Sequence, residues 1–210
     1  MGKPDKLVQT LPGFEHIKRY WDAAREIVAA KILPGEYYVT KQSEGIATVL
    51  GSCISACIRD PVARVGGMNH FMLPSGHDLT KSNQVVTSAT RYGNYAMEHL
   101  INDILKHGGR RERLEVKVFG GGKVIKDMVT MNIGERNIQF IDEYLKVEGL
   151  AILSHDVGDI YPRKVLYFPE TGVVRVKKLK SLHNDTLRQR ETQYFKRINE
   201  KPVTSDIELF

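Results

Sequence analysis

The sequence has only two cysteines in 210 residues, Cys53 and Cys57, and a single tryptophan. Two cysteines cannot supply the disulfide framework of a small secreted domain. Long apolar runs are missing as well. No run approaches the roughly 18 residues that span a bilayer, and the N-terminus lacks the apolar segment of a secretory signal. These absences predict a cytoplasmic protein without direct membrane insertion.

Charge of negative sign is in the minority, with 31 Lys and Arg against 25 Asp and Glu and a formal net charge of +6. Such a balance fits a nucleic-acid partner, an acidic protein surface or a plain solvated basic face. The positive residues are spread along the chain and form no block with interleaved aromatic residues. The sequence therefore predicts no nucleic-acid partner.

Hydrophobic periodicity predicts a single central α/β domain of the α+β type over residues 34–182. We expect a layered sandwich of mixed, largely antiparallel sheets with two main helices. The predicted helices span residues 89–105 and 132–148. The predicted strands lie in residues 35–41, 45–50, 53–60, 64–73, 114–122, 149–158, 163–169 and 172–179, and the last two form a hairpin.

Two extensions flank this domain. In residues 1–33, apolar side chains at helical spacing predict an amphipathic helix between Phe14 and Val28. Residues 183–210 are polar and weakly patterned, and we expect a helical or disordered tail. The segment between the predicted helix 89–105 and the preceding strand, residues 75–84, is predicted to be a loop.

Both cysteines lie in TVLGSCISACIRDPVARVGGMNHFMLP, residues 48–74. On one strand, Cys53 and Cys57 would be about 13 Å apart at roughly 3.3 Å per residue, too far for a disulfide. Zinc usually takes closer cysteine pairs on turns plus a second pair of ligands. Cys53, Cys57 and His70 offer neither, so no metal is predicted. Cys57, between Ala56 and Ile58, is expected to be a core residue.

Cys53 has a different setting because it follows Gly51-Ser52 at the junction of two extended segments. A thiol at such a turn can be a nucleophile, with neighbouring backbone N–H groups facing an oxyanion. A nucleophile needs a base, and His70 on the next strand is the candidate. On pattern alone, a lone histidine between Asn69 and Phe71 is more often a core residue. Spacing leaves both interpretations open.

The glycine run Phe119–Lys123, FGGGK, does not match the spacing of a phosphate-binding loop. We expect these glycines to let a loop pass close to another backbone, at the rim of the active site.

LGSCISACIRDPVARVGGMNHFMLP closely resembles the CheD family of chemoreceptor glutamine deamidases, and so do RYGNYAMEHLINDILKHGGRRERLEVKVFGGG, MNIGERN and HDVG…RKVLYFPETGVVRVKKL. The resemblance covers residues 35–180 in consistent order. It implies a layered fold related to deamidating bacterial toxins, with Cys53 as nucleophile and His70 as its partner. The family's third catalytic residue is a threonine; the ungapped match is Ala47, and the threonine is one place later, at Thr48.

The resemblance also implies a function for the central domain, as a deamidase that converts glutamines on the cytoplasmic helices of chemotaxis receptors to glutamate through a cysteine thioester, without a cofactor. Some receptor methylesterase activity is expected from the same intermediate. The predicted partners are receptor cytoplasmic domains and, as a regulator, a chemotaxis phosphatase. The alternatives are another thiol hydrolase and a non-catalytic binding module that regulates receptors or such a phosphatase.

Overall fold

A computed structural model describes residues 7–74, 88–124, 133–180 and 185–200. Strands dominate the first part of the chain, and helices alternate with strands afterwards. The elements are β1 (Lys18–Asp22), β2 (Ile27–Lys31), β3 (Tyr37–Thr40), β4 (Gly45–Leu50), β5 (Ile54–Asp60), β6 (Val65–Asn69), α1 (Ser88–Lys106), a 3₁₀ turn (Arg111–Arg113), β7 (Glu115–Gly120), α2 (Ile133–Val147), β8 (Ile152–Val157), β9 (Arg163–Phe168), β10 (Val173–Lys178) and α3 (Asp185–Glu200).

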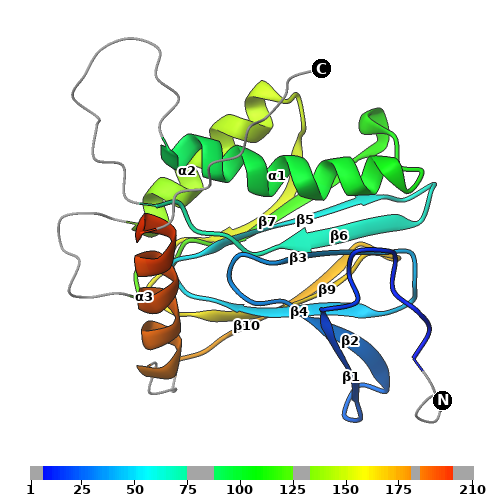
Figure 1. The fold of residues 1–210 in the computed structure, drawn as a ribbon, viewed down its shortest axis with the longest axis horizontal. Helices are drawn as coiled ribbons and strands as arrows, with labels where there is room; N and C mark the ends of the chain where they lie inside the picture. Colours follow the sequence, from blue (N-terminus) through cyan, green and yellow to red (C-terminus); the bar gives the residue numbers. More distant parts are fainter. Residues whose placement is uncertain (1–6, 75–87, 125–132, 181–184, 201–210) are drawn as a thin grey trace.

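The strands form two five-stranded sheets. The first has the order β1-β2-β4-β9-β10 and the second β3-β6-β5-β7-β8. Neighbours are antiparallel except β2–β4 and β7–β8, which are parallel. Figure 1 shows α1 and α2 covering one face of the second sheet, with the first sheet packed against the other face. The predicted α+β class, with layered, mixed and largely antiparallel sheets, is confirmed.

The helix predicted between Phe14 and Val28 is wrong. Instead, β1 and β2 form an antiparallel hairpin, with Trp21 opposite Val28 and Glu26 in the left-handed region at φ 53°. The apolar residues of this stretch are largely β-branched or aromatic, types that favour a pleated surface. Pairing of β2 with β4 then satisfies backbone groups that a helix would have satisfied within itself.

The predictions for the two main helices and for the hairpin are confirmed. The predicted helices 89–105 and 132–148 correspond to α1 and α2, and the predicted hairpin is β9–β10, closed by a hydrogen bond from the Gly172 amide to the Phe168 carbonyl at 2.8 Å. The predicted loop 75–84 lies outside the described residues. Across the described ranges, no helix is both long enough and apolar enough to cross a bilayer.

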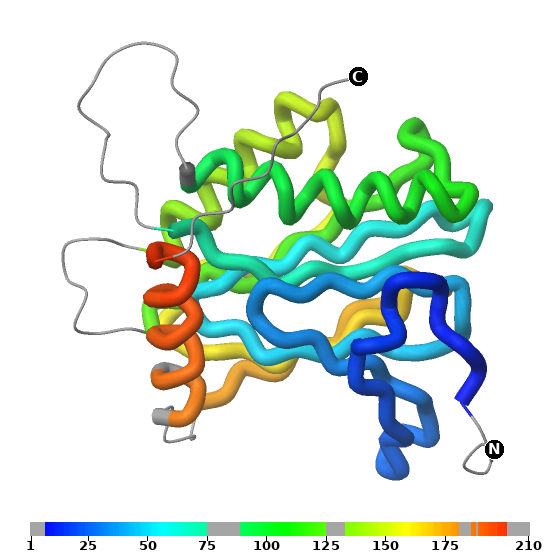
Figure 2. Tube along the Cα trace, in the orientation of Figure 1, coloured from blue at the N-terminus to red at the C-terminus, as the bar shows by residue number. Residues whose placement is uncertain are grey.

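Within the polar C-terminal segment, the described residues Asp185–Glu200 form α3, a third helix. Figures 1 and 2 show α3 standing across the ends of both sheets, on the side where the chain passes from β4 to β5. Because β4 belongs to the first sheet and β5 to the second, the connecting residues Gly51–Cys53 link the two layers. The predicted nucleophile therefore lies at the junction of the sheets, beside α3.

Candidate active site

The three predicted site residues come together from both sheets. Thr48 lies on β4 in the first sheet, His70 directly follows β6 in the second, and Cys53 lies in the connection between β4 and β5. All three are buried, with exposed fractions of 4% for Thr48, 0% for Cys53 and 2% for His70.

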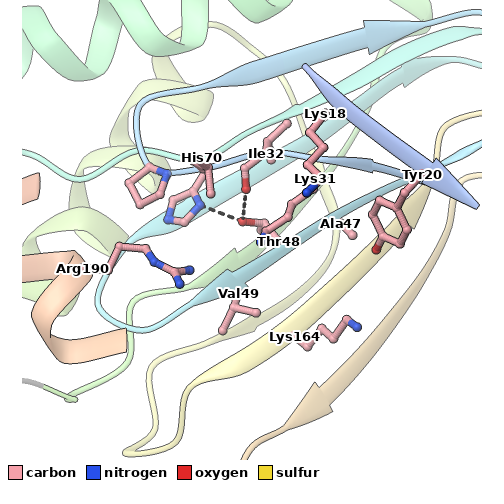
Figure 3. Close-up of a pocket in the computed structure, with 12 residues that line it drawn as sticks. Lys18, Tyr20, Lys31, Ile32, Ala47, Thr48, Val49, His70, Lys164 and Arg190 are labelled. Carbon is pink, nitrogen blue, oxygen red and sulfur yellow. Dashed lines mark hydrogen bonds between the residues drawn. The ribbon is translucent and has the colours of Figure 1, made fainter. Parts of the chain in front are cut away.

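The His70 ring is held by a hydrogen bond between its Nδ1 and the Thr48 Oγ1, at 2.8 Å (Figure 3). Thr48 Oγ1 lies 2.9 Å from the Ile32 carbonyl oxygen and donates its only proton to it. The hydroxyl must therefore accept from Nδ1–H, which assigns the proton of a neutral ring to Nδ1. The other ring nitrogen, Nε2, is buried without a partner among the described residues. This nitrogen is free to take a proton.

Cys53 and His70 are neighbours across the second sheet. Ile54 and Phe71 form a β-bridge, with reciprocal hydrogen bonds of 2.9 and 3.0 Å. Cys53 and His70 each precede one residue of that bridge, so they lie on the same face as a diagonal pair. Diagonal pairs are about 7–8 Å apart at the backbone, within reach of an imidazole side chain.

The surroundings keep both groups neutral. Burial, with a smaller contribution from the charge of Arg190, lowers the pKa of His70 to about 3. Burial raises the pKa of the Cys53 thiol well above its usual value, and the neighbouring Glu191 carboxylate raises it further through its charge and a hydrogen bond. In this arrangement Cys53 is a protonated thiol, and its ionisation requires that the thiol become less buried and that Glu191 move away.

Glu191 of α3 is the feature of the site that the sequence analysis missed. Its carboxylate accepts hydrogen bonds from the Gly51 and Ser52 amides at 2.8 and 2.9 Å, and from the Ser52 hydroxyl at 2.7 Å. The Cys53 amide contacts the same carboxylate at 3.4 Å. The residues from Gly51 to Cys53 thus form an anion-binding nest, and the anion that it holds is the Glu191 carboxylate of α3.

One sequence signal pointed to this contact. Glu191, Tyr194 and Ile198 have the i, i+3, i+7 spacing of a single helix face, and they are the buried ones among the side chains of α3 that the structure describes. A carboxylate at the start of an otherwise apolar helix face is expected to be buried. A buried carboxylate needs hydrogen-bond donors around it.

Two other elements hold the nest in shape. The predicted close approach of the glycine run is confirmed, since the Gly121 amide donates to the Cys53 carbonyl at 2.8 Å and the Gly122 amide to the Gly51 carbonyl at 2.7 Å. On the other side, Asn137 of α2 donates to the Ser52 carbonyl at 2.7 Å. These bonds engage the carbonyls of Gly51–Cys53 and leave their amides facing α3.

A pocket of about 610 Å³ opens beside His70 and Thr48, lined by strands of the first sheet, by the segment after β2 and by Arg190 of α3 (Figure 3). Its lining carries the basic side chains of Lys18, Lys31, Lys164 and Arg190. No acidic side chain is part of the lining that the described residues form, so the pocket is a basic opening next to the imidazole.

The other cysteine has no place in this site. Cys57 is 1% exposed within β5 and belongs to the hydrophobic core, as predicted. Both cysteines are free thiols. Among the described residues, no group of three or more His, Cys, Asp or Glu side chains is arranged to hold a metal ion.

These groups can support acyl transfer. They comprise a thiol, an imidazole with a fixed tautomer and a free Nε2, and backbone donors that already bind an anion.

The chain matches one family model and several named relatives. Residues 72–178 match the family model described as CheD chemotactic sensory transduction. The chain is 52% identical over 208 residues to a protein of Hahella chejuensis, covering 99% of this chain and 97% of the relative. It is 53% identical to a protein of Halorhodospira halophila over 95% of this chain and 93% of the relative. It is 58% identical to a protein of Herminiimonas arsenicoxydans over 91% of this chain and 93% of the relative. Each relative is named probable chemoreceptor glutamine deamidase CheD.

Proposed function

The chain belongs to the CheD family, and from this premise we propose that it is a protein-glutamine deamidase acting on the cytoplasmic helices of chemotaxis receptors. The reaction hydrolyses a side-chain amide to a carboxylate and releases ammonia. The names of the relatives, which share half or more of their residues with this chain over nearly its whole length, support this substrate class.

In the proposed mechanism, His70 Nε2 takes the proton of the Cys53 thiol, and Sγ attacks the side-chain carbonyl carbon of the substrate glutamine. Thr48 accepts a hydrogen bond from Nδ1–H, which keeps Nε2 unprotonated and fixes the orientation of the ring. Thr48 is therefore a positioning residue. The developing oxyanion is held by the amides of Gly51–Cys53.

The tetrahedral adduct then collapses. The carbon–nitrogen bond breaks, the His70 imidazolium gives its proton to the departing nitrogen, and ammonia leaves behind a glutamyl thioester. Water, losing a proton to the same Nε2, adds to the thioester and breaks the carbon–sulfur bond, which yields glutamate and the free thiol. A glutamyl methyl ester passes through the same thioester with methanol as leaving group, so receptor methylesterase activity belongs to this proposal.

The cellular setting follows from the substrate. Receptor helices that undergo this modification lie in the cytoplasm, so the protein is proposed to act there, with receptor cytoplasmic domains as its partners. A chemotaxis phosphatase as regulator stays a prediction from the family resemblance.

The observation that carries the proposal is the placement of a neutral imidazole, with Nδ1 held by Thr48 and Nε2 free among the described residues, next to a thiol whose neighbouring amides bind an anion. A plain core histidine needs no such set of donors around a nearby cysteine.

The first prediction concerns the nucleophile. Cys53→Ala is expected to lower deamidation of a purified receptor cytoplasmic fragment by a factor on the order of 10⁶, because loss of a nucleophile removes the covalent route. Mass spectrometry of the receptor peptides follows the exchange of an amide for a carboxylate, and an ammonia assay follows the other product.

The matched control is Cys57→Ala, which removes the buried thiol that lies outside the site and should retain activity. Equal activity of the Cys53→Ala protein and the wild type would refute the mechanism. Cleavage of the receptor backbone would indicate a protease, and unaltered receptor with retained binding would indicate a non-catalytic module.

A further inference from the structure

The site described above is closed. Cys53 has no exposed surface, and the donors that would hold an oxyanion are occupied by the Glu191 carboxylate. A glutamine side chain of a substrate cannot reach the thiol while α3 is in place. The contact between α3 and the nest therefore has to open before any turnover.

The ligand that closes the site is chemically the product of the proposed reaction. Glu191 presents a glutamate side chain from a helix, and both carboxylate oxygens are bound by donors of Gly51 and Ser52, with the Cys53 amide close by. The carboxylate also lies close enough to the Cys53 thiol to raise its pKa, in addition to the effect of burial. The side chain thus lies where a glutamate would lie directly after hydrolysis of a thioester at Cys53.

The nest is built for this close approach. A β-carbon on Gly51 would lie 2.7 Å from each carboxylate oxygen of Glu191, so a side chain there would expel the carboxylate. Glu191 is fully buried, yet no Lys or Arg forms an ion pair with it among the described residues. Its charge is balanced by backbone and hydroxyl donors, the same means by which a site stabilises an oxyanion.

The attachment of α3 to the rest of the molecule is otherwise light. Of its described side chains, only Tyr194 and Ile198 are buried along with Glu191, and Tyr194 contacts Tyr92 of α1 through a hydrogen bond between the two hydroxyls. The other described side chains of α3 are exposed or half-buried. Phe195 also packs, half-buried, against the hydrophobic core. A polar 16-residue helix is marginal on its own, so its docking depends on these contacts and can be reversed.

We propose that α3 is a product-like inhibitory helix: it occupies the cleft that receives the receptor helix, and it places the Glu191 carboxylate where the glutamate product of the reaction lies. This inference rests on the proposed function and adds its regulation. It also specifies how the substrate is presented, as a glutamine on a helix that enters between the nest and α1 in place of α3.

The proposal can be tested within the protein itself. Glu191→Gln replaces the product-like glutamate by a glutamine, the residue type of the substrate. With the introduced glutamine in the nest, Cys53 should attack the new side-chain amide and convert it to glutamate within the chain. Digestion after lysine yields the peptide of residues 181–196, in which Gln189 and Gln193 serve as internal controls that should keep their amides. In ¹⁸O-water, the carboxylate formed at position 191 should gain one heavy oxygen. The double variant that also carries Cys53→Ala should retain the introduced amide.

Inhibition is tested with Glu191→Ala, which removes the carboxylate and leaves Tyr194 and Ile198. Losing hydrogen bonds to a charged group should increase the open fraction about tenfold or more. Alkylation of Cys53 by iodoacetamide and deamidation of the receptor fragment should both accelerate by that factor, with Cys57 unlabelled. Glu200→Ala, an exposed acid on the same helix, is the matched control and should leave both rates unchanged.

The outcomes separate the two proposals. If the receptor fragment is deamidated but the glutamine introduced at position 191 keeps its amide, the product-like helix is refuted while the proposed function stands. The same holds if Glu191→Ala slows turnover in a protein with an unchanged melting temperature. If a folded protein converts neither the receptor nor the introduced glutamine, both proposals fail together.

Discussion

At the scale of single residues, the site depends on which ring nitrogen of His70 carries the proton. Thr48 can give its one proton only once and gives it to the Ile32 carbonyl, so it accepts from Nδ1. The sequence analysis located a threonine one place away from the expected position, on a strand whose adjacent residues point to opposite faces. The structure brings Thr48 to the imidazole without a bulge, since β4 pairs with β9 in an uninterrupted register.

This arrangement gives the second prediction. Thr48→Val should reduce kcat by about 10- to 100-fold, because the loss of an orienting partner lets Nε2 take the proton and leaves no free base. Thr48→Ser keeps the hydroxyl and should restore most of the activity. Steady-state kinetics on the receptor fragment measure both variants, and wild-type kcat in the valine variant would show that the Thr48 hydroxyl does not position the imidazole.

At the scale of elements, the nest takes its shape from the glycine loop after β7. Gly120 has a φ of 120°, and a β-carbon there would lie 2.2 Å from the Cys53 carbonyl oxygen. No side chain fits at this position, because the backbone at the end of β7 lies directly against the backbone of Cys53. The glycine run was predicted to pass close to another backbone, and in the structure that backbone is the segment at Cys53.

The third prediction compares two glycines with positive φ. Gly149→Ala, at φ 67° with open space around it, should cost about 1–2 kcal/mol of unfolding free energy from backbone strain alone. Gly120→Ala adds a collision with Cys53, worth about 1–3 kcal/mol more. Urea unfolding measures both values.

Activity separates the same two variants further. Displacement of the Cys53 carbonyl should abolish most deamidation in Gly120→Ala, whereas Gly149→Ala should retain it. Equal stabilities and equal activities of the two variants would contradict the close contact between the loop and the nucleophile segment.

At the scale of the whole molecule, four positively charged side chains gather at the pocket beside His70. Lys18 and Lys31 lie directly opposite each other on β1 and β2, an arrangement that repels. With Lys164 and Arg190 they line the pocket beside His70, and no ion pair neutralises any of the four within the described ranges. The pocket is therefore suited to acidic side chains around the target glutamine.

The fourth prediction follows from this charge. Lys31→Glu should raise the KM for the receptor fragment by about fivefold at low salt, as expected for the loss of roughly 1 kcal/mol of surface electrostatics. The difference from wild type should shrink as salt screens the charges. Lys31→Glu also places a carboxylate opposite Lys18, so folding should not suffer.

Lys146→Glu, at the exposed end of α2, changes the net charge equally but is not part of the pocket lining. It should leave KM unchanged. An equal rise in KM for both variants would mean that net charge, rather than the pocket, attracts the substrate.

The amino-acid sequence by itself determined the local chemistry: a cysteine after Gly51-Ser52, a histidine on the next strand, a glycine run that permits close packing, and the α+β class of the central domain. These features depend on residue types and short spacings, which one stretch of chain carries within itself. The tertiary structure alone decided the hairpin of β1 and β2, because pairing with β4 outweighs a helical pattern. It also decided that Glu191 closes the site, because this contact joins residues about 140 positions apart, and no local pattern encodes which donors a buried carboxylate will find.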